Sequence, residues 1–99
     1  MIRIRLFNRA GSFAEDKDLA RTIRREQIIP ALNRHEEVVL DFENVDSATQ
    51  SFIHALISDV IRKHGSAALD RMSFRSCNPT VKKIIGIVAD YMQEGLGPE

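Results

Sequence analysis

The sequence has few of the residues from which several common kinds of site are built. A single cysteine, Cys77, and no tryptophan occur in the 99 residues. One thiol can form neither an internal disulfide nor a cysteine-ligated zinc site. The chain also has no net charge, because 14 lysines and arginines balance 14 aspartates and glutamates. No overall field draws such a chain to nucleic acid or to an anionic membrane, and we expect neither as a partner.

Long apolar runs are missing as well. The longest span only a few residues, far short of the roughly 20 that cross a bilayer. Met1 leads directly into an alternating segment without the basic start and apolar stretch of a signal peptide, so we expect a cytoplasmic protein. The length favours one domain, which we place at 1–94, with a flexible tail at 95–99.

Hydrophobic periodicity predicts three main strands. Residues 2–7 alternate in the manner of a half-buried strand, with Arg3 and Arg5 facing water. The turn that follows indicates a hairpin with a short second strand. The apolar run 38–42 suits a central strand buried on both sides, and 71–76 predicts the third main strand.

Helices are expected between these strands. The first spans 16–34, with a kink or break near Ile28 because the ring of Pro30 clashes with the preceding turn. The last begins at Asn78 and Pro79, a natural N-cap and a natural first residue. The second has a core-facing stripe made of Phe52, Ile53, Leu56, Ile57, Val60 and Ile61. This order predicts an α/β sandwich around a small, mixed, mostly parallel sheet with about three helices.

The junction before the second helix is rich in hydroxyl and amide side chains. Ser47 and Gln50 fit a capping box, in which the two side chains bond to each other's backbone N–H groups. This pattern predicts a helix that starts at Ala48 and places Ser51 in its first turn.

Helical geometry then separates Ser51 from the apolar stripe. At about 100° per residue, Ser51 lies nearly opposite the stripe, beside Ala55, Ser58 and Arg62. We expect these residues to be exposed, and Ser51 to lie near a positive helix end that favours phosphate. A strip of small side chains also lets a partner's backbone approach closely. A solvated face without function explains the same pattern.

Acidic side chains gather where the central strand ends. Oxygen ligands from Asp41, Glu43 and Asp46 suit magnesium, whereas turn formation and helix capping explain the same acids more simply. No two of the three histidines, His35, His54 and His64, have ligand spacing on one face. Cys77 lies just before a helix N-cap, where either an activated thiolate or a plain half-buried thiol fits. The arginines at 21, 24 and 25 are interleaved with acids, which is a weak pattern for nucleic-acid binding.

Three segments together resemble STAS domains, the small α/β modules of anti-sigma-factor antagonists and sulphate-transporter tails. "VVLDFENV" is similar to their apolar strand ending in aspartate, and "TQSFIHALI" stands at their serine motif. "SCNPTVKKII" resembles the Asn-Pro junction before their last helix. The similarity runs from about Ile2 to Met92. It is nearest to the divergent STAS-like group of uncharacterised bacterial domains.

The resemblance implies a non-enzymatic, protein-binding role without a cofactor. In the antagonists, a partner ATPase of the histidine-kinase-like fold phosphorylates the second serine of the motif, which is Ser51 here. Thr49, Gln50 and Phe52 stand where the family has aspartate, serine and glycine. The expected partner is such an ATPase or an anti-sigma factor, and the expected contact surface comprises Ser51, Thr49, Gln50, Ala55 and Ser58.

Two other hypotheses stay open. The first is a ligand-sensing or oligomer-forming domain without phosphorylation, which includes a homodimer. The second is a small metal-dependent enzyme that uses Asp41, Glu43 and Asp46. A neighbouring gene for an ATPase of the histidine-kinase-like fold would favour the regulatory module over both.

Overall fold

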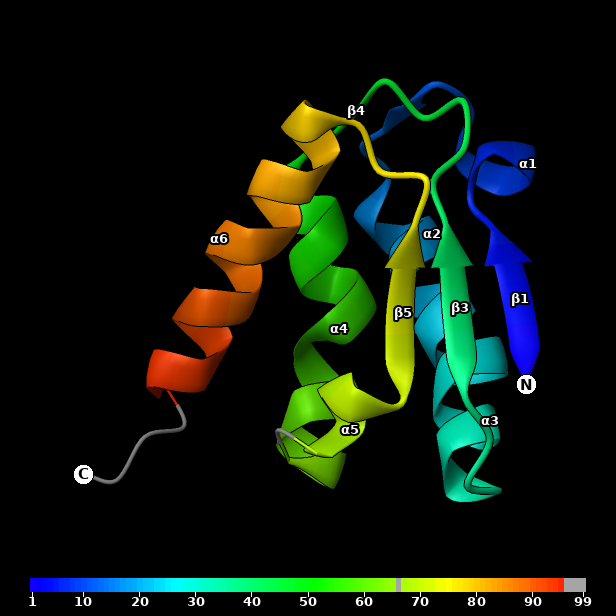
Figure 1. The fold of residues 1–99 in the computed structure, drawn as a ribbon, viewed down its shortest axis with the longest axis vertical. Helices are drawn as coiled ribbons and strands as arrows, with labels where there is room; N and C mark the ends of the chain where they lie inside the picture. The colour runs from blue at the N-terminus through cyan, green and yellow to red at the C-terminus, as the bar shows by residue number, and fades with distance from the viewer. Residues whose placement is uncertain (66, 96–99) are drawn as a thin grey trace.

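Three parallel strands form the main sheet of the computed structural model, which describes residues 1–65 and 67–95. Strands β1 (Ile2–Arg5), β3 (Val38–Asp41) and β5 (Met72–Arg75) lie in the order β1-β3-β5. Their arrowheads point the same way in Figure 1, as the register requires. The predicted central strand and its parallel neighbour are therefore confirmed. The sheet is wholly parallel, although a mixed sheet was expected.

The two faces of this sheet differ in polarity. Ile4 and Leu40 are paired neighbours that point into the core, and both are buried. The opposite face carries Arg3, which is exposed as predicted, and Asp41, which lies beneath it. The helices α2 (Lys17–Ile23) and α3 (Ile29–Asn33) lie behind the strands in Figure 1. The central strand thus packs on helices at one face and under charged side chains at the other.

The predicted hairpin after the first strand is wrong. The chain instead makes one helical turn, α1 (Phe7–Ala10), and leaves it at Gly11, whose φ of 75° suits glycine. The next strand, β2 (Phe13–Ala14), pairs in parallel with β4 (Ser47–Ala48) and forms a second sheet. The N–H group of Thr49 extends this pairing with a bond of 2.9 Å to the carbonyl oxygen of Ala14. The turn α1 carries the chain away from β1, so no strand returns beside it.

The first long helical segment has three parts. They are α2 (Lys17–Ile23), the π-helical η1 (Arg24–Ile28) and α3 (Ile29–Asn33). Pro30 has no N–H group with which to continue an α-helical ladder, and a π-helical turn accommodates that loss. The predicted interruption near Ile28 is confirmed in this form.

The remaining helices are α4 (Gln50–His64), α5 (Ala67–Asp70) and α6 (Pro79–Gly95). In Figure 1, α4 lies between α6 and the sheet. Five of the six predicted stripe residues of α4 are fully buried, which confirms its core face: Phe52, Ile53, Leu56, Ile57 and Val60. The side chain of Ile61 lies outside the described structure.

The three predicted helical segments are present, and α1 and α5 are short additions to them. The helix α6 extends to Gly95, the first residue of the expected tail. The rest of the expected tail, 96–99, lies outside the described residues. Among the helices that the structure describes, none is long and apolar enough to cross a membrane.

Candidate functional site

One side chain fixes the loop between β3 and α4 against the last helix. The Nδ2 group of Asn78 donates a hydrogen bond of 2.8 Å to the carbonyl oxygen of Asp46. Its Oδ1 atom accepts from the N–H group of Val81 at 2.8 Å, which confirms the predicted N-cap of α6. Asn78 therefore joins the start of α6 to the loop that leads into α4.

The cap of α4 is Thr49, not Ser47. The N–H group of Phe52 donates to Thr49 Oγ1 at 3.0 Å, and α4 begins at Gln50 rather than Ala48. Ser47 does not cap α4 because the next residue, Ala48, is itself an extended residue of β4 paired with Ala14, so no helix starts there. The capping box was a wrong prediction, since strand pairing two residues upstream moves the helix start.

Ser51 lies in the first turn of α4 and is exposed, as predicted. Gln50 beside it is exposed, and Thr49 is half-buried. Phe52 is fully buried and anchors this turn in the core. Ser51 is thus an accessible hydroxyl on a rigid helix start.

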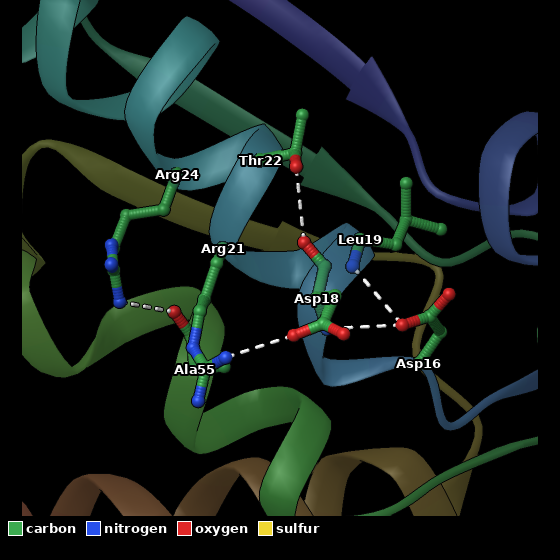
Figure 2. Close-up of polar contacts among 7 residues, drawn as sticks. All are labelled: Asp16, Asp18, Leu19, Arg21, Thr22, Arg24 and Ala55. Carbon is green, nitrogen blue, oxygen red and sulfur yellow. Dashed lines mark hydrogen bonds and ion pairs between the residues drawn. The ribbon is translucent and has the colours of Figure 1, made fainter.

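Two other members of the expected surface are not exposed. Ala55 and Ser58 are only 6% and 7% accessible, although the helical wheel predicted a solvated strip. A long side chain from η1 covers this side of α4: Arg24 Nη1 donates to the carbonyl oxygen of Ala55 at 2.8 Å (Figure 2). Arg24 Nη2 also lies 3.3 Å from Asp59 Oδ2. Arg24 lies against this part of α4, and the packing of α2 and α6 on the same helix adds to the burial of its small residues.

These small residues lie at the bottom of a groove of about 470 Å³. Lys17, Arg21 and Arg24 line one wall of this groove, and α4 forms its floor. In Figure 2, Arg21 and Arg24 both extend from their helical segment toward the backbone of α4 near Ala55. The floor includes four of the five predicted contact residues, namely Gln50, Ser51, Ala55 and Ser58.

The opposite wall of the groove belongs to α6 and is largely apolar. Ile87, Val88 and Tyr91 line it. Val88 is 4% exposed, whereas Ile87 and Tyr91 are 42% and 68% exposed. His54 adds an imidazole from α4 to the same groove. The groove therefore lies between a basic wall and an apolar one.

The sequence analysis did not identify this groove, although each of its walls has a pattern in the sequence. Lys17, Arg21 and Arg24 follow i, i+4, i+7 spacing, which places them on one helical face. Ile87 and Tyr91 are likewise four residues apart on α6. Only the packing of both helices on α4 brings the two faces together.

The acidic residues at the end of β3 do not form a shared site. Asp41 is 1% exposed, and its Oδ2 atom accepts from Arg3 Nη2 at 2.6 Å. Its Oδ1 atom accepts from the N–H group of Glu43 at 2.9 Å. That backbone bond, followed by the bond from Arg3, lowers the pKa of Asp41 from its ordinary value. Both carboxylate oxygens of Asp41 already have partners, so we assign it a structural role.

The side chains of Glu43 and Asp46 are exposed. Within 1–65 and 67–95, no three His, Cys, Asp or Glu side chains form a group that could hold a metal ion. Cys77 is half-buried, and burial raises the pKa of its thiol, which favours the plain half-buried thiol of the two alternatives. The arrangement of the described side chains thus gives the metal-enzyme hypothesis no support.

The chain thus forms a small parallel α/β domain with an exposed serine at the first turn of the helix after its central strand. A family model described as a STAS-like domain of unknown function matches residues 20–82, which is more than half of the chain. The chain therefore belongs to this STAS-like family, and the resemblance stated from its sequence is confirmed. No curated protein and no solved structure matches the chain.

Proposed function

We propose that this domain is a cytoplasmic regulatory module that binds a partner protein through the start of α4 and the loop before it. The partner is an ATPase of the histidine-kinase-like fold or an anti-sigma factor, and phosphorylation of Ser51 by such an ATPase switches the complex. The role is one of binding and not of catalysis. The observation that carries the proposal is the exposed hydroxyl of Ser51 at the first turn of α4.

The surroundings of Ser51 favour both a contact surface and a phosphate. Thr49 and Asn78 hold the backbone on either side of the β3–α4 loop, so a partner meets a preformed surface at little cost in entropy. The first N–H groups of α4 and the side chains of Lys17 and Arg21 in the same groove supply positive charge. Ser58 is buried, so we assign the switch to Ser51 alone.

Ser51→Glu and Ser51→Ala are expected to differ in their affinity for the partner. Phosphorylation adds a charge of about −1.5 to −2. In the free domain this charge is solvated and lies near Lys17 and Arg21, whereas a partner that covers the start of α4 has to remove its water, which is costly. Ser51→Glu should therefore weaken the complex by at least about tenfold, or roughly 1.4 kcal/mol. Ser51→Ala should bind within about twofold of the native protein, because it removes only an exposed hydroxyl. The partner is identified by pull-down from the native cell, and each variant is titrated against it.

Thr80→Glu is the matched control. Thr80 is exposed and is the second residue of α6, as Ser51 is of α4, so the new charge meets the same helix-end environment. Thr80 does not line the groove. This variant should leave the affinity nearly unchanged. Equal affinity for Ser51→Ala and Ser51→Glu, or an equal loss with Thr80→Glu, would show that Ser51 is not the switch.

A further inference from the structure

The groove over α4 has the lining of a ligand site. Its volume of about 470 Å³ lies within the range of about 300–1,000 Å³ that small-molecule pockets occupy. Its basic wall comes from α2 and η1, and its apolar wall from α6. Ile87 and Tyr91 are large apolar side chains that remain exposed on that wall. Such a lining suits a molecule that has an anionic group at one end and an apolar body at the other.

Two cationic side chains of the basic wall, Lys17 and Arg21, are available to bind an added anion. Lys17 forms no ion pair among the described residues. Arg21 pairs with Asp18 at 2.8 Å, and both side chains are open to solvent, at 49% and 79%. An exposed pair of this kind contributes little, so a ligand anion can take the place of Asp18.

Arg24 is a more buried cation of the same wall than Arg21. Its side chain is 11% exposed, and Asp59 and the carbonyl oxygen of Ala55 hold its two terminal nitrogens. Its Nε atom is buried without a hydrogen-bond partner among the described residues. Because solvent does not reach this nitrogen, Arg24 forms part of the wall and does not contact the anion.

The floor leaves room for a ligand beside these groups. Ala55 and Ser58 have small side chains, so α2 and α6 flank an open channel above α4. Gln50 and Ser51 lie at the N-terminal end of the same floor, where the helix backbone contributes positive partial charge. The positive charge therefore concentrates along α2 and the start of α4, and the apolar surface along α6.

We propose that this groove binds a small amphipathic anion. Its anionic group contacts Lys17 and Arg21, and its apolar body packs on Ile87 and Tyr91. This site goes beyond the proposed function, because the isolated domain binds the ligand without a partner or a phosphate. Failure of either proposal leaves the other standing.

The test uses anilinonaphthalene sulfonate, a sulfonate on an aromatic body whose fluorescence rises in an apolar site. Phenylnaphthylamine carries the same rings without the sulfonate and is the matched control ligand. Titration of the isolated native protein should give saturable binding of the sulfonate, at least about tenfold tighter than that of the neutral compound, because only the sulfonate meets the basic wall. Added salt should weaken the binding of the sulfonate more than the binding of the neutral compound.

Variants of each wall locate the site. Arg21→Glu should weaken sulfonate binding by at least about tenfold, since it places like charge beside the anion. Tyr91→Ser should weaken both compounds, because it removes the aromatic part of the apolar wall. Arg25→Glu is the control: Arg25 is exposed and outside the groove, and it should change affinity by less than about twofold.

The structural readout is amide chemical-shift mapping, which should place the sulfonate's perturbations on α2, the first turns of α4 and the middle of α6. An unchanged unfolding midpoint shows that each variant is folded. The proposal is overturned by absence of saturable binding, by equal affinity for the two compounds, or by an equal loss with Arg25→Glu. Perturbed amides elsewhere in the chain also overturn it.

Discussion

Replacing Leu56 by alanine is expected to lower the free energy of unfolding by about 2–5 kcal/mol. Leu56 is fully buried on the core face of α4, among Ile53, Ile57 and Val60. Its truncation removes buried apolar surface and leaves a cavity that close-packed neighbours fill only in part. Total stability of a domain is about 5–15 kcal/mol, so the loss is large. Urea denaturation of the native and variant proteins measures it.

Leu69→Ala is the matched control for this prediction. Leu69 belongs to α5 and packs against the core while only half-buried, so the same chemical change removes less buried surface. Its loss should be clearly smaller than that of Leu56→Ala. A smaller loss for Leu56→Ala than for Leu69→Ala would mean that α4 does not present this face to the core.

Asp41→Asn is expected to destabilise the fold by about 1.5–3 kcal/mol at neutral pH, because hydrogen bonds to a charged group are stronger than neutral ones. Asparagine retains an acceptor for the N–H group of Glu43 but loses the charge that Arg3 binds at 2.6 Å. The pKa of Asp41 is lowered in the folded state, chiefly by the bond from Glu43 and then by Arg3. The contribution of Asp41 to stability is therefore fully present above its unfolded-state pKa, and it is lost as the pH falls through its folded-state pKa.

The pH dependence of this stability difference tests whether the charge of Asp41 is its cause. The difference between the native protein and Asp41→Asn should shrink as the pH falls below 3.8, the ordinary value for this carboxyl group. Asp46→Asn is the control, since the Asp46 side chain is exposed, and it should change stability by less than about 0.5 kcal/mol. Denaturation at a series of pH values measures both. A difference that stays constant into acid would show that the charge of Asp41 is not what stabilises the fold.

The parts of the fold that depend on local sequence periodicity were predictable. The core stripe of α4, the central position of β3 and the cap at Asn78 each follow from a pattern within one segment. The short strand β2 was predicted, but its pairing with β4 was not predictable, because the two-residue strand β4 is defined by that pairing and not by any pattern of its own. That pairing also decided between Ser47 and Thr49 as the cap of α4, so a tertiary contact overrode a local motif.

In the candidate site, too, features set by local sequence were predictable and features set by tertiary contacts were not. Exposure of Ser51 followed from the helical wheel, because nothing in the described structure packs over that side of the first turn. Burial of Ala55 did not follow, because the wheel contains only the residues of α4 itself. Its cover is the long side chain of Arg24, which comes from a different segment and bonds to the α4 backbone. A charged side chain that packs lengthwise over small residues has no signature in hydrophobic periodicity.

Phosphosite mapping by mass spectrometry of the protein from its native cells tests the regulatory role most directly. Trypsin cuts after Arg34 and Arg62, so all four hydroxyl side chains between these arginines fall on one peptide: Ser47, Thr49, Ser51 and Ser58. Fragmentation of that peptide distinguishes them. We expect a single phosphate on Ser51, because Ser58 is buried, Thr49 caps α4 and Ser47 lies in the small sheet. A phosphate on one of the other three residues, or none on Ser51 under any growth condition, would contradict the proposed switch.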